Sequence, residues 1–208
     1  MDIDIFIIAS LIGSVAFALS GYLIGVRNKL DFMGIFIVSI LTANGGGALR
    51  DVLVNRVPAV LSDPFAFFLV CGVILIATFF KLHKRTNVEN NTLMILCDAV
   101  GLVAFSITGT LIGLEVGLPV FGVMVLSFIT ATGGGIIRDM LVNQTPSVLS
   151  SDFYGTISLI IAASIYTLHS YNLADDCMIA ITFSTALMLR ILAYRMGWKL
   201  PHIRPDGE

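Results

Sequence analysis

Long hydrophobic stretches without charged residues alternate with short polar segments along the whole chain. Seven such windows are found, at residues 5–26, 32–49, 64–80, 92–114, 116–137, 153–174 and 177–189. The fourth window is interrupted only by Asp98. Because a bilayer core of about 30 Å is crossed by about 20 apolar helical residues, the pattern predicts an all-α integral membrane protein with seven transmembrane helices. The longest polar gap, residues 83–91, leaves no room for a soluble domain.

Composition narrows the class of protein further. Of the 208 residues, 57% are hydrophobic and 12% are charged, and the mean hydropathy is +0.95. Average soluble domains carry about 25% charged residues, so a cytosolic enzyme and a disordered protein are excluded. A net charge of −2 offers no basic surface for nucleic acid. The sequence has no Ser-His-Asp or Cys-His set and no metal-ligand spacing, so we expect neither enzymatic activity nor a cofactor or metal site. We expect Cys71, Cys97 and Cys177 to be buried in apolar surroundings.

The distribution of charge between the windows predicts the orientation. Basic residues follow the first and third windows and fill the C-terminal end: Arg27, Lys29, Lys81, Lys84, Arg85, Arg190, Arg195, Lys199 and Arg204. Acidic residues occupy the other side: Asp2, Asp4, Glu115, Asp175 and Asp176. Because short cytoplasmic loops are enriched in Lys and Arg, we expect the N-terminus outside and the C-terminus in the cytoplasm. The N-terminus lacks the basic region of a secretory signal, so the first window is retained as a helix.

An internal repeat covers most of the chain. Residues 42–62 align with residues 130–150 at an offset of 88, and 14 of the 21 positions are identical. We therefore divide the single domain, residues 1–208, into repeat one (residues 3–82), repeat two (residues 91–170) and a seventh helix (residues 175–197). Because three spans per repeat is an odd number, the two repeats should enter the bilayer from opposite sides. Inverted repeats of this kind commonly enclose a transport path at the bilayer midplane.

The aligned block contains two triple-glycine runs, Gly45-Gly46-Gly47 and Gly133-Gly134-Gly135. Each glycine inside a helix costs about 1 kcal/mol relative to alanine. Irregular backbone at membrane depth is tolerated only inside protein or along a wet cavity, so the runs predict a kink or break that frees backbone groups as ligands. The alternative is that glycine lets two helices pack closely.

Each glycine run is followed by Arg-Asp and, four residues after Asp, by Asn. The first set is Arg50, Asp51 and Asn55, and the second is Arg138, Asp139 and Asn143. Asp and Asn at this spacing should share one helix face, and retention of the whole set in both repeats favours a role at the mouths of a path. The alternative is that these residues snorkel and cap the helix ends.

Other polar residues lie inside the apolar windows. Asp98 is an intramembrane acid, which is a functional candidate by default, with snorkelling to the nearby interface as the alternative; Ser10 occupies its place in repeat one. The hydroxyl and amide groups that precede the glycine runs are candidates to line a wet path: Ser39, Thr42, Asn44, Ser127, Thr130 and Thr132. Ser and Thr also bond to their own helix carbonyls.

The duplicated GGG-x-x-RD-x-L-V-N-x-x-P block within a 3+3+1 arrangement resembles the prokaryotic members of the trimeric intracellular cation (TRIC) channel family. The resemblance implies a homotrimer in a membrane, in which each protomer encloses its own potassium-permeable pore between kinked second and fifth helices. By this resemblance, residues 45–47 and 133–135 are the kink sites. The residues beside the pore mouths are Arg50, Asp51, Arg138 and Asp139.

Two features refine what the resemblance implies. Where animal members carry a lysine-bearing lipid-binding motif, this chain has GGGALRD, and its tail is short, which favours a prokaryotic plasma membrane. Related bacterial proteins are also described as transporters of small amino acids such as glycine. The sequence thus predicts a monovalent cation channel, with a secondary transporter of a small amino acid as the alternative.

Two GxxxG pairs occupy equivalent positions of the repeats, at Gly21 and Gly25 and at Gly109 and Gly113. Small residues at this spacing let helices pack closely, so these glycines should face either the partner repeat or a neighbouring protomer.

Overall fold

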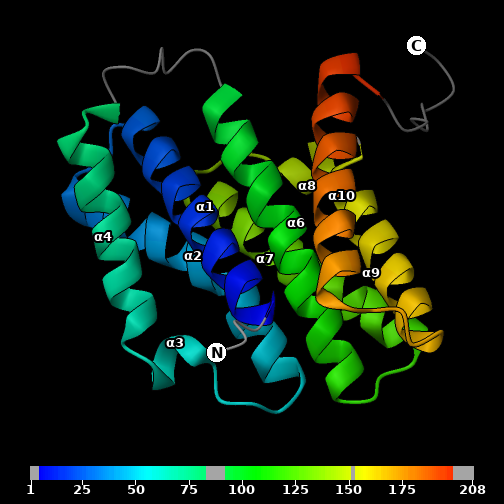
Figure 1. Cartoon of the computed structure of the whole chain (residues 1–208). Helices are drawn as coiled ribbons and strands as arrows, with labels where there is room; N and C mark the ends of the chain where they lie inside the picture. The colour runs from blue at the N-terminus through cyan, green and yellow to red at the C-terminus, as the bar shows by residue number, and fades with distance from the viewer. Residues whose placement is uncertain (1–4, 83–91, 151–152, 199–208) are drawn as a thin grey trace, which may run out of the picture.

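The computed structural model describes residues 5–82, 92–150 and 153–198, and all regular elements in these ranges are helices. The first repeat contributes α1 (Ile5–Arg27), α2 (Phe32–Leu53), α3 (Ala59–Ser62) and α4 (Phe65–Phe79). The second contributes α6 (Thr92–Glu115), α7 (Val120–Leu141), α8 (Ser147–Ser150) and α9 (Tyr154–Ser170), and α10 (Asp176–Met196) follows. Figure 1 shows these helices as one bundle.

Among the described residues, five helices are long and apolar enough to cross a membrane, namely α1, α2, α6, α7 and α10. The third and sixth predicted spans correspond to the shorter helices α4, of 15 residues, and α9, of 17 residues. Hydropathy overestimates their length because it does not register helix ends. The sixth window runs to residue 174, but α9 ends at Ser170, and Asn172 then adopts a positive φ of 55°. The segment 83–91, predicted to be a polar connection, lies outside the described residues.

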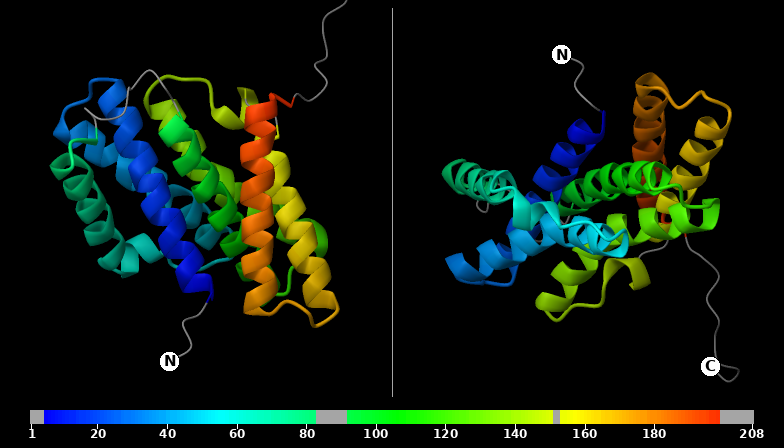
Figure 2. Two further views of the ribbon diagram at one scale, coloured as in Figure 1. Left: turned by 45° about the horizontal axis from the view of Figure 1, so that its top comes forward. Right: turned by 90° about the horizontal axis from the view of Figure 1, so that it is seen from below.

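The two repeats pack against each other in opposite directions. Helix α1 lies along α6 and α2 lies along α7, whereas α4 packs on α1 and α9 packs on α6 and α7. Figures 1 and 2 show α3 at the end of the bundle where α1 begins and α8 at the other end. Helix α10 has no counterpart in repeat one and covers α6 and α9.

Contacts across the repeat boundary are reciprocal. Phe17 packs over Gly101 and Phe105 packs over Gly13, and the two phenylalanine rings lie 5.3 Å apart between centroids. These are equivalent positions, 88 residues apart. A self-complementary contact of this kind is what a twofold axis produces, so the axis that relates the repeats passes near Phe17 and Phe105.

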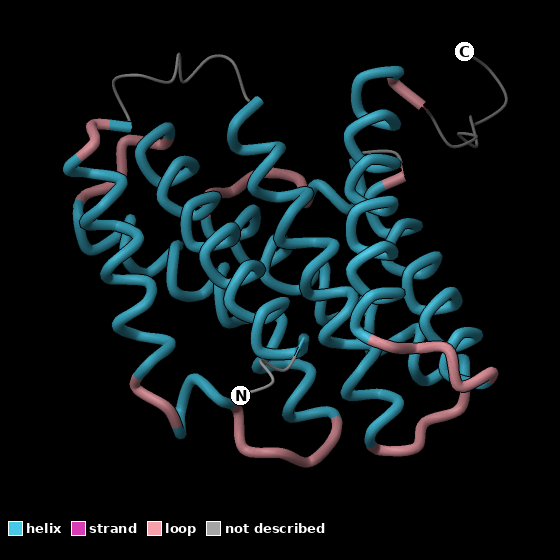
Figure 3. The backbone as a smooth tube through the Cα atoms, viewed as in Figure 1, coloured by secondary structure: helices cyan, strands magenta, loops and turns pink. Residues whose placement is uncertain are grey.

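The triple glycines lie at the crossing of α2 and α7, and both helices continue through them without interruption, as the tube in Figure 3 shows. Neither helix is broken at its glycine run, whereas a kink within each continuous helix stays a prediction. A Cβ on Gly46 would overlap the carbonyl oxygen of Thr130, and a Cβ on Gly134 would overlap the carbonyl oxygen of Thr42. The middle glycines allow the two backbones to touch, which is the close-packing alternative.

The GxxxG pairs pack inside each repeat. A Cβ on Gly21 would lie 2.6 Å from the Cα atom of Ser39 on α2, and a Cβ on Gly109 would lie 2.8 Å from the Cα atom of Ser127 on α7. Gly25 and Gly113 likewise approach the next helix of their own repeat. The expectation that these glycines face the partner repeat or a neighbouring protomer is wrong, because they join consecutive helices.

Candidate functional site

An open cavity lies in the first repeat, near the N-terminal end of α1. The cavity has a volume of about 280 Å³ and lies between α1, α2, α3, α4 and α6. We call it the N-side cavity. Its polar wall includes Ser10, Ser14, Asn44, Arg50, Asp51 and Asp63. Gly47 also lines it, so the third glycine of the run faces the cavity while Gly46 forms the helix crossing.

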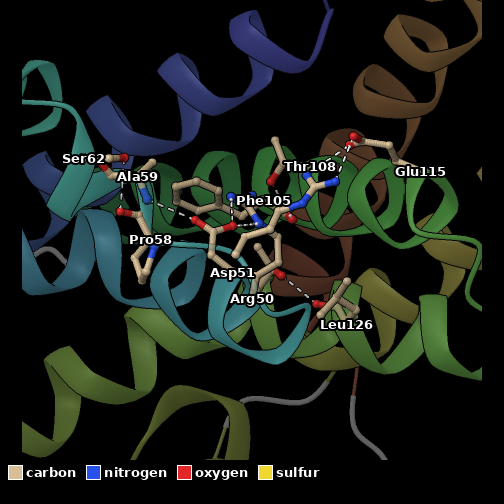
Figure 4. Close-up of polar contacts among 11 residues, drawn as sticks. Arg50, Asp51, Pro58, Ala59, Ser62, Phe105, Thr108, Glu115 and Leu126 are labelled. Carbon is tan, nitrogen blue, oxygen red and sulfur yellow. Dashed lines mark hydrogen bonds and ion pairs between the residues drawn. The ribbon is translucent and has the colours of Figure 1, made fainter.

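Arg50 and Asp51 form a closed ion pair in the cavity wall. The Nε and Nη2 atoms of Arg50 donate to Oδ1 of Asp51 at 2.9 and 2.7 Å. Oδ2 of Asp51 accepts from the backbone N–H of Ala59, the first residue of α3, at 3.2 Å, as Figure 4 shows. The guanidinium also lies 5.6 Å from the ring centroid of Phe6. Since this pair is neutral, Asp63 gives the lining of the N-side cavity a net charge of −1.

The equivalent place in the second repeat is filled by a buried ionic cluster, which we call the C-side cluster. Arg138 is fully buried, and its Nε and Nη2 atoms contact Oδ1 of Asp139 at 2.9 and 2.8 Å. Nη1 of Arg138 donates to Oδ1 of Asp98 and to Oγ of Ser20. Oδ2 of Asp139 accepts from the N–H and the hydroxyl of Ser147, at 2.8 and 3.0 Å.

Two further side chains, Tyr154 and Arg190, complete the C-side cluster. Tyr154 begins α9 and is 2% exposed, and Arg190 comes from α10 and is 4% exposed. The Arg190 guanidinium lies 4.9 Å from the Tyr154 ring centroid, which is a cation–π distance. Two arginines and two aspartates make the cluster neutral. The sequence predicts a functional role for Asp98, Arg138 and Asp139 but not for Ser20 or Tyr154. It indicates Arg190 only as one of the basic residues of the C-terminal end.

Asn55 and Asn143 terminate helices and do not share a helical face with the aspartates. Both residues have positive φ, 58° and 56°. The residue after each donates its N–H to the carbonyl of Asp51 or of Asp139, at 2.8 Å in both cases. Asn is one of the few L residues that adopt the left-handed conformation at a helix end. The predicted shared face is wrong, and capping explains why both repeats have Asn here.

Most of the predicted lining hydroxyls bond inside the helices. Thr42, Thr130 and Thr132 donate to the carbonyl four residues earlier, at 2.6, 2.6 and 2.7 Å, and all are buried. Ser127 donates to the carbonyl of Ser106, and Ser39 is buried beneath Gly21. Of the six predicted lining residues, the N-side cavity touches Asn44, whose amide also donates to the carbonyl of Ile40.

At the surface, Arg56 and Glu115 join the ends of α2 and α6. The guanidinium donates to both carboxylate oxygens, at 3.2 and 2.8 Å, and Figure 4 shows Glu115 at this end of α6. The hydrogen bond with Glu115 raises the pKa of Arg56 above its ordinary value. Both side chains are solvent-exposed, so the pair contributes at most about 1 kcal/mol.

The cysteines and other metal-binding side chains form no site in the described residues. No group of three or more His, Cys, Asp or Glu side chains comes together there. The three cysteines are free thiols. Cys97 is buried as expected and Cys71 is half-buried, but Cys177 is exposed. The expectation of burial is wrong for Cys177 because it begins the outermost helix, α10.

Comparison with known proteins gives consistent matches over nearly the whole chain. The family model described as "Glycine transporter" matches residues 7–82 and 95–170. The Bacillus subtilis membrane protein YvgT is 33% identical over 93% of this chain and 94% of its own. The Escherichia coli inner membrane protein YadS is 31% identical over 94% and 95% of the two chains.

Among solved structures, the trimeric intracellular cation channel orthologue from Rhodobacter sphaeroides superposes with a TM-score of 0.86. It is 27% identical to this chain, and the match covers 93% of this chain and 98% of that one. The family model and the solved structure thus describe the same helical membrane fold. The chain belongs to this family, the family of the prokaryotic TRIC channels.

Proposed function

We propose that the chain is a membrane channel for monovalent cations, potassium first, with one conduction path inside each protomer. The observation that carries the proposal is the N-side cavity, an opening inside a single chain whose charged lining residues, Arg50, Asp51 and Asp63, sum to −1. A cleft with a net negative charge and low-dielectric walls concentrates cations. The name of the Rhodobacter sphaeroides relative as a cation channel supports the same conclusion.

The path we infer uses side chains and not freed helix carbonyls. A cation entering the N-side cavity is attracted by Asp63 and solvated by water, by the amide oxygen of Asn44 and by the hydroxyls of Ser10 and Ser14. Arg50 does not repel it, because Asp51 holds the guanidinium through two hydrogen bonds. From there the path continues past Gly47, beside the crossing of α2 and α7, toward the equivalent place in repeat two.

We further propose a homotrimer in a prokaryotic inner membrane, with the N-terminus outside. The trimeric relative supports the assembly and the E. coli inner membrane protein supports the location. The orientation rests on the basic residues. In a background in which Cys71, Cys97 and Cys177 are replaced by alanine, cysteines introduced at Asn28, after α1, and at Tyr171, after α9, should be labelled in intact cells only at Tyr171. Labelling of Asn28→Cys alone would show that the protein has the opposite orientation.

Potassium flux tests the channel directly. The purified full chain in liposomes should dissipate a potassium gradient, and the variant Asp63→Asn should reduce the initial rate about fourfold at low salt, since a unit charge about 5 Å from the ion contributes about 0.8 kcal/mol in water. The reduction should shrink as salt screens the charge. Asp176→Asn removes an acidic residue of α10 that does not line the cavity and should leave the rate unchanged. Potassium-impermeable liposomes would contradict the channel.

A glycine transporter is the second candidate. The description of the family model favours it, and so does the presence of a guanidinium and a carboxylate, Arg50 and Asp63, in the lining of the N-side cavity. The carboxylate of glycine would have to replace Asp51 as the partner of Arg50. The same liposomes separate the two functions. Uptake of labelled glycine driven by a cation gradient, without passive potassium flux, would select the transporter.

A further inference from the structure

A second groove lies at the opposite end of repeat one from the N-side cavity. It has a volume of about 320 Å³ and lies between the last turns of α1, the start of α2 and the last turns of α4. We call it the α1–α4 groove. Its apolar lining includes Val26, Leu30 and Ile35. The two polar lining residues contact each other, because the hydroxyl of Thr78 donates to the hydroxyl of Tyr22 at 3.4 Å. The groove therefore offers mainly hydrocarbon surface to an occupant.

The rim of the α1–α4 groove is basic. Lys29 is adjacent in sequence to a lining residue, Lys81 follows another by three positions, and both lysines are exposed. Figure 1 shows the last turns of α1 and α4 at the same end of the bundle. Among the described residues, neither lysine has an ion-pair partner. Arg27 adds a third positive charge at the end of α1, and Asp31, which caps α2, adds a negative one. Three positive charges and one negative charge give this rim a net charge of +2.

The corresponding helix ends of repeat two show that the fold does not require this basic rim. At the offset of 88, Lys29 and Lys81 correspond to Gly117 and His169. Lys29 and Gly117 both have a positive φ, of 56° and 72°, and Lys81 has one of 51°. Glycine adopts this conformation without steric cost, whereas other L residues rarely do. The two lysines thus stand at left-handed positions for a reason other than backbone conformation.

The groove itself also differs between the repeats. Thr78, which is exposed, corresponds to the larger Tyr166. Ile35 is half-buried, whereas the equivalent Val123 is 0% exposed. Repeat two therefore has a bulkier side chain and a covered wall where repeat one has open volume. The open groove and the basic rim occur together in repeat one.

We propose that the α1–α4 groove binds an anionic phospholipid, with an acyl chain on the apolar lining and the phosphate held by Lys29 and Lys81. The side chains beside the groove are suited to lipid contact, since Phe32 and Phe79 are apolar and 68% and 81% exposed. Basic residues at the membrane surface attract anionic head groups. In the proposed orientation the groove opens to the cytoplasmic leaflet. The lipid site is separate from the proposed conduction path, because none of its lining residues borders the N-side cavity.

Native mass spectrometry of the purified full chain in detergent micelles tests the head-group contact. The chain is titrated with dioleoylphosphatidylglycerol or with dioleoylphosphatidylcholine, two lipids with the same acyl chains, and the anionic lipid should bind more tightly. Lys29→Gln and Lys81→Gln should each weaken binding of phosphatidylglycerol about fivefold and leave binding of phosphatidylcholine unchanged. Both lysines are exposed, so these substitutions leave the packing intact.

A charge-matched control separates this site from general attraction to a basic surface. Arg195→Gln removes one positive charge from the last turn of α10, outside the lining of the α1–α4 groove. It should leave the binding of phosphatidylglycerol unchanged. A loss in Arg195→Gln equal to that in the lysine variants would overturn the site, as would a phosphatidylglycerol affinity that neither lysine affects.

Filling the groove tests the acyl-chain contact without changing the charge. Thr78→Tyr places the residue of repeat two at the edge of the groove and should weaken binding of both lipids at least about tenfold, the contribution of about two buried methylene groups. Thr78→Val removes the hydrogen bond with Tyr22 but keeps the size of the side chain, and it should bind both lipids as the unsubstituted chain does. Unchanged binding in Thr78→Tyr would overturn the groove as the lipid site. Glycerol 1-phosphate, the soluble head group, should not compete with phosphatidylglycerol, and competition at equal concentration would show a phosphate site in place of a lipid site.

Discussion

Replacing Arg138 by methionine is expected to destabilise the protein by about 3–5 kcal/mol, the cost of breaking a buried ion pair from one side. The side chain is 0% exposed and compensates both Asp98 and Asp139. Methionine has a similar length and would leave two buried carboxylates without the guanidinium that both of them contact. The measurement is the midpoint of unfolding by denaturant in detergent micelles, compared with the unsubstituted chain.

The equivalent substitution in repeat one, Arg50→Met, is the matched control. Arg50 contacts one carboxylate, that of Asp51, and borders the open N-side cavity, with 8% of its side chain exposed against 0% for Arg138. We expect a loss of about 1.5–3 kcal/mol, the contribution of hydrogen bonds to a charged group. Adding Asp98→Asn to Arg138→Met should recover part of the stability. Equal losses of stability in Arg138→Met and Arg50→Met would contradict the view that Arg138 neutralises more buried charge than Arg50 does.

The sequence predicts the positions of the helices well because burial in lipid requires long apolar segments. Five of the seven windows contain helices long enough to cross a membrane, and the misjudged lengths of α4 and α9 come from their ends, where backbone conformation decides. Phe153, for example, falls inside an apolar window but has a φ of 58° and precedes α9. Hydropathy carries no information about such left-handed residues.

The charged site is only partly predictable for a different reason. Asp98, Arg138 and Asp139 stand out because a charge inside an apolar window is costly. The contact between Asp98 and Arg138 joins residues 40 apart, and the contact between Arg138 and Ser20 joins residues 118 apart. Spacing along a helix says nothing about such pairs. The repeat alignment does carry a signal for Tyr154, since alanine stands at the equivalent position 66.

The triple glycines show how one motif supports two interpretations until the neighbouring backbone is known. A costly run of glycines predicts either a flexible break or a close approach, and the sequence favours the break because the run is duplicated. In the structure the duplicated runs instead make the same contact twice, because Gly46 packs on the backbone of Thr130 and Gly134 packs on the backbone of the equivalent Thr42. A twofold crossing needs the same small residue on both helices.

Single alanine substitutions within one run distinguish close packing from flexibility. Gly46→Ala is expected to destabilise the chain by about 1–3 kcal/mol or more, the cost of overpacking, because the new Cβ would overlap the carbonyl of Thr130. Gly47→Ala should be neutral or stabilising by up to about 1 kcal/mol, the helix propensity gained over glycine, since its Cβ meets only the end of Arg50. A Cβ on Gly72 would have no atom within 4 Å in the described structure, so Gly72→Ala measures the gain in helix propensity alone.

Unfolding midpoints and potassium flux, measured on the same three variants, decide between the interpretations. If close packing explains the run, Gly46→Ala alone loses stability, and Gly47→Ala folds and is at least as stable as Gly72→Ala. If bending of α2 is what the glycines provide, Gly46→Ala and Gly47→Ala should both stabilise the helix and both reduce flux, because each removes one flexible position. The steric contact with Thr130 makes the first outcome the expected one, and equal behaviour of the two neighbouring glycines would contradict it.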